Sequence, residues 1–393
     1  MPLLLYIDMY LIYILGKVLR SRSKFKVLSS VIITSALIVP VFMLALFFDF
    51  KTWPPALVFL LFSGLSVFYA AKIISAILLG INHLFDKIIY ININIHKHYY
   101  TFVALIALII VSVMTYGLFF TVRNIKITEE TITIEHLPED FNNLNIIHIS
   151  DLHLGSWLSK HSIIKMVKII NELEPDLIFI TGDIVNFHSG EVERFDSILS
   201  LLDPAIGTFS VLGNHDYGNY VYWDNESQKE DNLEKLVASQ ESYGWEVLRN
   251  ESIAIEKNGK KLIIAGVENW GAESRFPKKG CIEEAIKEID TTNVILLLSH
   301  DPSYWENVIK DQYSFIDITF SGHTHGLQMG LTNKQSAARL LFKYWGGLFK
   351  YKVDNHELYL NINTGMGFLG YPGRVGVRPE ITKIKLVNTT NKN

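Results

Sequence analysis

The sequence of residues 146–155 is IIHISDLHLG, an apolar run followed by a carboxylate and an imidazole. The run is typical of a buried strand, and Gly155 permits the chain to turn away after it. Asp151 and His153 are two residues apart, so in an extended segment both side chains point to the same side. Such a pair can bind a borderline-hard metal ion, although an isolated Asp-x-His is more often an incidental polar turn.

Four further blocks of the same character each follow an apolar run. They are Thr181-Gly182-Asp183, Gly213-Asn214-His215-Asp216, Ser299-His300-Asp301 and Ser321-Gly322-His323-Thr324-His325. Strands are expected at residues 125–134, 146–149, 177–180, 209–212, 262–267, 294–298, 316–320, 358–362 and 381–387, and helices at 161–173, 232–243 and 281–289. This alternation favours an α/β domain, in which functional residues gather at the carboxyl ends of strands.

The blocks contain more nitrogen and oxygen ligands than one metal ion takes, so we expect two ions. One shared carboxylate would hold them about 3.5–4 Å apart, a geometry that polarises a phosphoryl oxygen and generates hydroxide at neutral pH. A phosphate ester is therefore the expected substrate. Mixed His, Asp and Asn ligands suit manganese, iron or zinc, and no thiolate narrows the choice.

In this order the five blocks resemble the calcineurin-like metallophosphoesterases, and the resemblance covers residues 144–386. It is closest to the membrane-anchored branch that includes the YkuE and YaeI phosphoesterases, through residues 150–155, 321–326, 363–367 and 372–374. Leu327 departs from that branch, which often has a second glycine before Gln328, and we expect it to alter loop packing and not metal binding. The resemblance implies a four-layer α/β fold, a β-sandwich flanked by helices.

The resemblance also implies a role for each block. The first metal would be held by Asp151, His153 and His325, the second by Asn214, His300 and His323, and Asp183 would bridge the two. His215 would protonate the leaving oxygen or stabilise the transition state instead of binding metal. Asp216 is the expected partner that orients His215.

The first third of the chain predicts membrane helices. Residues 29–48 and 101–122 contain no charge, and residues 53–84 carry only Lys72; a span needs roughly 20 apolar residues. Residues 1–18 are a fourth candidate, weakened by Asp8, and a cleaved signal peptide is the alternative there. Lys72 is expected to snorkel or to face a neighbouring helix, with a role in transport as the alternative. We therefore expect a membrane region with about four helices over residues 1–123 and a catalytic domain over 124–393.

Basic residues predict the orientation of these helices. Five lie before the second apolar segment: Lys17, Arg20, Arg22, Lys24 and Lys26. The next loop holds only Lys51, and the one after it holds Lys87 and Lys97. Because positive loops stay in the cytoplasm, the chain after Val122 is expected outside it. This predicts a multi-pass protein of a bacterial-type inner or plasma membrane with an extracytoplasmic catalytic domain.

Composition limits the partners. The net charge of −4 and the pI near 6.4 give no nucleic-acid footprint, and the single cysteine, Cys281, excludes an intramolecular disulfide. Membrane lipids and a phosphate-ester substrate are the expected partners, and no protein partner is evident.

Several residues outside the blocks have open interpretations. His161 and His188 are expected to be solvated, and Arg374 and Arg378 either contact substrate phosphate or lie in a surface loop. Residues 334–352 mix basic and aromatic side chains. That mixture suits either a membrane interface or a loop packed over the active site.

The sequence thus predicts a membrane-anchored, metal-dependent phosphodiesterase or pyrophosphatase. Only residues 123–143 separate the last apolar segment from the first catalytic strand, which favours a lipid-linked or membrane-proximal substrate. The alternatives are a phosphomonoesterase acting on small soluble substrates, a non-catalytic binding or signalling protein that keeps the fold, and a transporter-coupled domain. The room around His215 would decide between monoester and diester.

Overall fold

The computed structural model describes residues 2–18, 25–26, 29, 32–33, 36, 53–89, 96–353 and 356–389. The chain forms two compact units. The first comprises Met1–Phe120 with Gly370–Gly373, and the second comprises Thr121–Leu369 with Arg374–Asn393. Most of the span predicted over residues 29–48 lies outside the described residues, as do Arg20, Arg22, Lys24 and Lys51.

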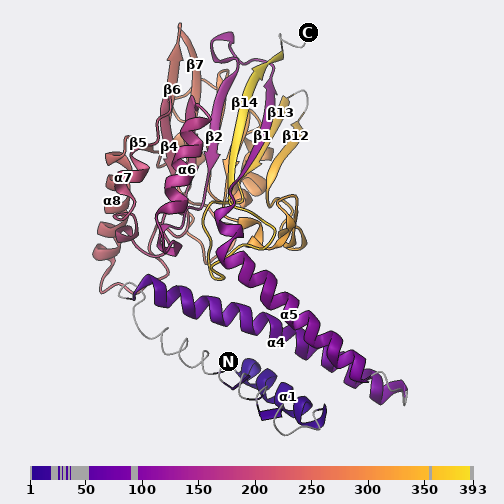
Figure 1. Cartoon of the computed structure of the whole chain (residues 1–393). Helices are drawn as coiled ribbons and strands as arrows, with labels where there is room; N and C mark the ends of the chain where they lie inside the picture. Colours follow the sequence, from indigo (N-terminus) through magenta and orange to yellow (C-terminus); the bar gives the residue numbers. More distant parts are fainter. Residues whose placement is uncertain are drawn as a thin grey trace. The chain divides into compact units, whose positions relative to one another are not determined.

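The first unit contains the helices α1 (Pro2–Val18), α4 (Pro55–Ile89) and α5 (His96–Phe119) (Figure 1). Two stretches, Ala56–Phe85 and His98–Arg123, are long and apolar enough to cross a membrane. The apolar part of α1, Leu3–Ile14, is shorter than a span needs. Among the described residues, two of the four predicted spans therefore have helices that match them.

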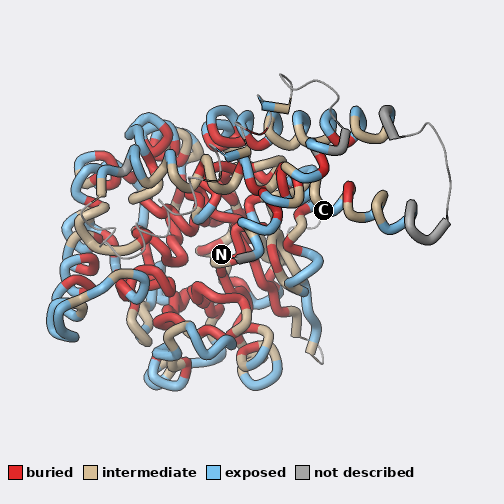
Figure 2. The backbone as a smooth tube through the Cα atoms, turned by 90° about the horizontal axis from the view of Figure 1, so that it is seen from below, coloured by how far each residue is buried: buried red, intermediate tan, exposed pale blue. Residues whose placement is uncertain are grey.

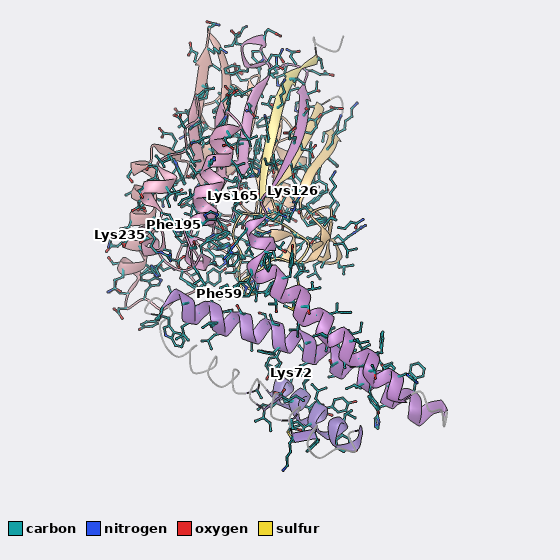
Figure 3. All side chains as sticks on the ribbon, viewed as in Figure 1. Phe59, Lys72, Lys126, Lys165, Phe195 and Lys235 are labelled. Atoms are coloured by element: carbon teal, nitrogen blue, oxygen red, sulfur yellow. The ribbon has the colours of Figure 1, made fainter. Side chains whose placement is uncertain are left out.

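Lys72 faces a neighbouring helix, which was one of its two expected environments. Lys72 lies on α4 (Figure 3). Its Nζ lies 2.6 Å from Oδ1 of Asp8 on α1, and the Tyr69 hydroxyl donates a hydrogen bond of 2.8 Å to Oδ2 of the same carboxylate. Both charges are buried. The carboxylate that weakens α1 as an apolar segment is thus paired with a cation on α4, which removes the cost of an isolated buried charge.

The second unit is built on two six-stranded sheets. The first sheet has the order β1 (Lys126–Ile134), β14 (Glu380–Asn388), β2 (Leu144–Ile149), β3 (Leu177–Thr181), β4 (Gly207–Val211) and β5 (Trp245–Val247). The second has the order β12 (Gly347–Val353), β13 (His356–Ile362), β9 (Ile318–Ser321), β8 (Val294–Leu298), β7 (Lys260–Gly266) and β6 (Glu251–Lys257). A small ribbon pairs β10 (Gly330–Thr332) with β11 (Gln335–Ser336).

Strand direction brings the predicted blocks to one end of the sandwich. In the first sheet β2, β3 and β4 run parallel, so their carboxyl ends meet. In the second sheet β7, β8, β9 and β13 run parallel in the same way. These strands are almost wholly buried and rich in Ile, Leu and Val, as parallel strands covered on both faces must be. β1 pairs parallel with β14, which is antiparallel to β2, so β1 ends at the opposite end of the sandwich.

Helices cover the outer face of each sheet. The first sheet packs against α6 (His161–Glu172), α7 (Asp196–Leu199) and α8 (Glu226–Ser242) through residues such as Met166, Ile170 and Phe195. The second packs against α9 (Ile282–Ala285), α10 (Pro302–Tyr304) and the π-helical turn η6 (Trp305–Ile309), which is followed by the short helix α11 (Lys310–Gln312). Side chains of both sheets, including Phe179, Phe209 and Phe320, fill the space between them.

The strands accordingly form the most buried part of this unit (Figure 2). The remaining short helices are the 3-10 turns η2 (Thr121–Arg123), η3 (Glu139–Phe141), η4 (Leu154–Ser156), η5 (Ser189–Glu191), η7 (His325–Gln328) and η8 (Ala337–Leu340). Helix, sheet, sheet and helix follow one another as four layers, which confirms the predicted fold class.

Candidate metal centre

The loops that carry Asp151 and Asp183 are joined through their backbones. The Asp151 amide donates to the Gly182 carbonyl and the His153 amide donates to the Asp183 carbonyl, each at 3.0 Å. Asp151, His153 and Asp183 all have positive φ angles, of 51°, 43° and 54°. Such angles are strained for residues other than glycine, and the surrounding hydrogen bonds hold them in place.

Two of the glycines beside the ligands are required by close packing. A Cβ at Gly182, whose φ is +80°, would lie 2.4 Å from the amide nitrogen of Gly213. A Cβ at Gly322 would lie 1.8 Å from Oγ of Ser150 and 2.4 Å from Oδ2 of Asp151. Neither position admits a side chain, so these strand ends approach one another more closely than other residues would allow.

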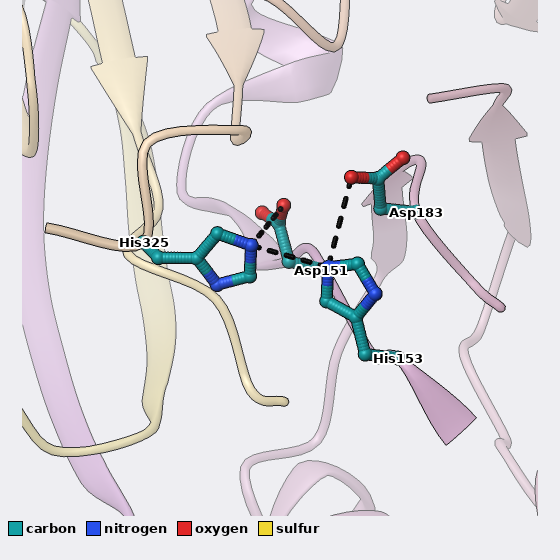
Figure 4. Close-up of side chains that lie close together, drawn as sticks. All are labelled: Asp151, His153, Asp183 and His325. Atoms are coloured by element: carbon teal, nitrogen blue, oxygen red, sulfur yellow. Dashed lines mark hydrogen bonds and ion pairs between the residues drawn. The ribbon is translucent and has the colours of Figure 1, made fainter. Parts of the chain in front are cut away.

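A first cluster of ligand atoms lies where β2, β3 and β9 end (Figure 4). Nε2 of His153 is 3.1 Å from Nε2 of His325, which is 3.3 Å from Oδ1 of Asp151. Nε2 of His153 is also 3.6 Å from Oδ2 of Asp183. All four residues are buried, and their ligand atoms lie within 4.8 Å of one another.

A second cluster shares Asp183 with the first. Oδ2 of Asp183 is 3.3 Å from Nε2 of His300, and that nitrogen is 3.2 Å from Nδ1 of His323. Nδ1 of His300 donates to the Thr181 carbonyl at 2.6 Å, so Nε2 is the nitrogen that faces the carboxylate and could ligate a metal once it is deprotonated. Oδ1 of Asn214, in the loop after β4, is buried without a hydrogen-bond partner in the described part of the chain.

These distances fit metal ligands better than hydrogen bonds. Ligands bound at about 2.0–2.2 Å to one ion lie roughly 3.0–3.5 Å from each other. The nitrogens of His153 and His325 face each other and two carboxylate oxygens, an arrangement that protons alone would satisfy poorly. The unpartnered oxygen of Asn214 adds a further ligand atom. The donor set therefore fits a divalent cation of the manganese, iron or zinc type.

The buried charged groups of the two clusters shift one another's pKa values. Burial alone would raise the pKa of Asp183, but His300 and the other imidazoles outweigh it and lower that pKa well below its usual value. Burial opposes the charged form of His300, yet the Asp183 carboxylate raises its pKa to about 10. Burial lowers the pKa of His153 to about 3 and raises the pKa of Asp151 to about 7. Without a cation, one imidazolium therefore balances the shared carboxylate.

Metal binding is expected to release a proton from His300. A ligating imidazole must be neutral, and the raised pKa of His300 keeps it charged at neutral pH in the metal-free protein. Metal affinity should therefore rise with pH, by up to about tenfold per unit between pH 6 and 8. Calorimetric titration of the metal-free protein with Mn²⁺ in buffers of different ionisation enthalpy counts the protons released. A proton count of zero, with affinity independent of pH, would contradict this assignment.

His215 is held by contacts that leave one ring nitrogen available. Its amide donates to Oδ1 of Asp183 at 2.8 Å, and its Nδ1 donates to the Asn186 carbonyl at 2.8 Å. The Tyr220 ring stacks on the imidazole with a centroid distance of 4.2 Å. Nδ1 is thus occupied, and Nε2 is the nitrogen that can act on a substrate.

The prediction that Asp216 orients His215 is wrong. Both Asp216 carboxylate oxygens accept backbone hydrogen bonds, from the amides of Asp183, Ile184, Val185 and Gly213. The partner of the His215 ring is the Asn186 carbonyl instead. Asp216 therefore holds the loop that presents Asp183, because a carboxylate satisfies several amide donors better than an imidazole can.

Sequence reasoning missed three side chains around the centre. Tyr220 stacks on His215 and accepts a hydrogen bond from the Asn214 amide group. Glu191 accepts from the amides of Gly155, Asn186 and Phe187, and so ties the first block to the loop that holds His215. Oδ2 of Asp301 lies 3.6 Å from Nε2 of His323. Asp301 belongs to the block Ser299-His300-Asp301, so the sequence could have indicated it. Tyr220 and Glu191 belong to no recognisable motif.

The arginines with two open interpretations differ in environment. Arg374 is buried and donates to the carbonyls of Thr364 and Gly367, so it does not lie in a surface loop. Arg378 is partly exposed, and its Nη1 donates to Asn124. Leu327 has a φ of 49°, a conformation in which glycine would be unstrained. That explains why a glycine suits this position, and why the departure affects the loop.

Known proteins that are similar to this chain indicate its family. The profile of the calcineurin-like phosphoesterase family matches residues 144–327. An uncharacterized metallophosphoesterase of Aquifex aeolicus (strain VF5) is 30% identical over 269 residues, which cover 68% of this chain and 94% of that protein. YkuE of Bacillus subtilis (strain 168), also described as an uncharacterized metallophosphoesterase, is 25% identical over 70% of this chain and 90% of its own length.

A vertebrate relative is longer than the matched region. A transmembrane protein with metallophosphoesterase domain from Danio rerio is 30% identical over 287 residues, or 72% of this chain. This chain spans only 62% of that protein. The resemblance inferred from the five blocks is confirmed, and the chain belongs to the calcineurin-like metallophosphoesterase family.

Proposed function

We propose that the protein is a membrane-anchored phosphodiesterase or pyrophosphatase that uses two divalent metal ions on a lipid-linked phosphate ester. The observation that carries the proposal is Asp183, whose carboxylate belongs to both ligand clusters. Asp151, His153 and His325 would hold one ion, Asn214, His300 and His323 the other, and Asp183 would bridge them. Ions at such a centre polarise the phosphoryl oxygens and neutralise developing charge.

His215 would act as the general acid. Hydrolysis breaks the bond between phosphorus and the leaving oxygen, and that oxygen must gain a proton as water supplies the new oxygen on phosphorus. With Nδ1 donating to the Asn186 carbonyl, a proton carried on Nε2 is the one that the ring can transfer. Stacking of Tyr220 keeps the imidazole in this orientation.

The membrane anchor is proposed from α4 and α5, the two helices long and apolar enough to span. α5 ends at Phe119 and β2 begins at Leu144, so the first ligand loop follows the anchor after a short length of chain. The distribution of basic residues supports a multi-pass topology with the catalytic domain outside the cytoplasm. In that orientation the natural substrates would be membrane lipids that carry a phosphate ester.

Residues 334–352 were expected to form either a membrane interface or a loop packed over the active site. Residues 330–345, which overlap that region, have features of both. Trp345 is buried and its carbonyl accepts a hydrogen bond from the Thr324 hydroxyl, next to His325. Leu331, Leu340 and Leu341 of the same segment are 82%, 83% and 72% exposed. Arg339 and Lys343 lie beside these leucines in the sequence. Exposed leucines among basic residues suit insertion between lipid headgroups, so we propose that these three leucines contact the bilayer.

The double substitution Leu340→Ser and Leu341→Ser is expected to slow the hydrolysis of lipid substrates and to leave the hydrolysis of soluble substrates nearly unchanged. For the full chain in phospholipid vesicles, we expect hydrolysis of a bilayer-embedded lipid phosphodiester to fall roughly tenfold, because the apolar contact with lipid is lost. Hydrolysis of soluble bis-p-nitrophenyl phosphate in detergent should stay within about twofold. The matched control is Leu201→Ser, at another exposed leucine. Equal loss on both substrates, or no turnover of any lipid phosphate by a protein that cleaves the soluble diester, would contradict the lipid assignment.

A further inference from the structure

A second group of metal-ligating side chains lies away from the centre described above. His136 follows the end of β1, Asp317 directly precedes β9, and His356 is the first residue of β13. β1 ends, and β9 and β13 begin, at the end of the sandwich opposite the catalytic loops. β9, which links Asp317 to the loop of His323, spans residues 318–321, so roughly 13 Å of strand lies between the two parts of the backbone that carry them.

The three side chains converge on one carboxylate oxygen. Nε2 of His136 and Nε2 of His356 each lie 3.5 Å from Oδ1 of Asp317. The two imidazole rings have a centroid distance of 5.8 Å. All three ligand atoms lie within 4.8 Å of one another. Three elements from two different sheets thus direct nitrogen or oxygen lone pairs at a common point.

Hydrogen bonds do not account for this convergence. A distance of 3.5 Å exceeds the roughly 2.7–3.2 Å of an N–H···O bond. Among the described residues, Oδ1 of Asp317 and Nε2 of His356 have no hydrogen-bond partner, although both atoms are buried. The Asp317 side chain is 1% exposed, and its other oxygen accepts from the Ile295 amide at 2.9 Å, which holds the carboxylate in place. Burial raises the pKa of Asp317 to about 7, which shows that its ionised form is costly here, and a bound cation would remove that cost.

An ion pair with a charged His136 explains the group less well. Burial lowers the pKa of His136, and the neighbouring His356 lowers it further against the opposite effect of Glu135. The neutral imidazole of His136 is therefore favoured at neutral pH, and this form can ligate a metal but cannot form an ion pair.

The spacing matches a zinc-type site. Ligands held about 2.0–2.1 Å from a tetrahedral ion lie roughly 3.3–3.4 Å apart, close to the two distances of 3.5 Å. Nε2 of His356 and Oδ1 of Asp317 are buried, but the His136 side chain is 41% exposed, so water can approach from its side and supply a fourth ligand. We propose that His136, Asp317 and His356 bind one zinc-type divalent ion, distinct from the catalytic metals, which links β1 of the first sheet to β9 and β13 of the second.

Zinc stoichiometry tests this site in the full-length protein. Metal-free protein in detergent is equilibrated with Zn²⁺ and dialysed, and its bound zinc is measured by elemental mass spectrometry. We expect His136→Gln and Asp317→Asn to bind about one zinc fewer per chain than the wild type. The matched control is His161→Gln, at an exposed histidine on α6, which should bind the wild-type amount. Zinc should also raise the unfolding temperature of the wild type and the control more than that of the two variants.

Hydrolysis of bis-p-nitrophenyl phosphate shows that each variant is folded and retains its catalytic metals. Because His136 is largely exposed, its variant should fold even if Asp317→Asn does not, and its zinc count then decides the question. An equal zinc count in His136→Gln and His161→Gln would overturn the proposal. So would variants whose loss of stability is the same in chelator and in zinc, since that result describes an ion pair.

Discussion

Replacing Asp183 by Asn is expected to lower phosphodiester hydrolysis by roughly a thousandfold or more. Among the described residues, its carboxylate is the only side chain shared by both ligand clusters. Asparagine keeps an oxygen that can accept the His215 amide, but it removes the negative charge that would bridge two cations. A metal centre contributes several kcal/mol to the stabilisation of transition-state charge, and about 1.4 kcal/mol corresponds to a tenfold change in rate. The measurement is kcat/KM of the full chain for bis-p-nitrophenyl phosphate with saturating Mn²⁺.

Metal content measured on the same samples distinguishes a lost ion from a misplaced nucleophile. Asp203→Asn, at an exposed aspartate, is the matched control and should retain wild-type activity and metal. If Asp183→Asn keeps both its metal and most of its activity, the shared carboxylate is not a bridge. If the wild type binds metal but cleaves neither soluble nor lipid phosphate, the alternative of a binding protein with this fold gains support.

The second large effect is expected for His215→Ala, with a dependence on the leaving group. Loss of a general acid typically costs about 10²–10⁴-fold in rate. The cost should be greatest for alkyl diesters, whose leaving oxygen needs a proton. It should be much smaller for p-nitrophenyl esters, whose leaving group departs as a stable anion. Metal content should change little, because the His215 ring donates to the Asn186 carbonyl and stacks on Tyr220, and it touches the ligand His153 only edge to face, at a centroid distance of 5.0 Å.

Two companion variants sharpen this test. Tyr220→Phe keeps the ring that stacks on His215 and removes only the hydroxyl that accepts from Asn214, so the preference among leaving groups should persist. His161→Gln changes an exposed histidine outside the five blocks and should leave the hydrolysis of both kinds of ester unaffected. Equal losses by His215→Ala on alkyl and aryl esters, accompanied by loss of metal, would make His215 a ligand or a structural residue.

Local patterns in the sequence were sufficient for most of the sandwich. Buried parallel strands such as β2, β3 and β8 are uniformly apolar, so each appears as a short run ending in a polar block. Helix limits were less accurate. α8 begins at Glu226, before the predicted residue 232, because the Asn225 side chain accepts from the Gln228 amide and caps the helix there. The strands β5, β6 and β12 were missed, since short or largely exposed strands lack a continuous apolar run.

The sequence by itself predicted an α/β domain and the set of polar residues that follow the strands, because strand ends and apolar runs are local properties. The resemblance of the five blocks to a known family added the four-layer fold. Which of those residues meet was decided by the order and direction of the strands in the tertiary structure. The choice of the Asn186 carbonyl over Asp216 as the partner of His215, and the pairing of Asp8 with Lys72, follow from such contacts. The group of His136, Asp317 and His356 has no motif at all, since its members approach only when two sheets stack. Contacts between residues far apart in the chain depend on packing and leave no local pattern to detect.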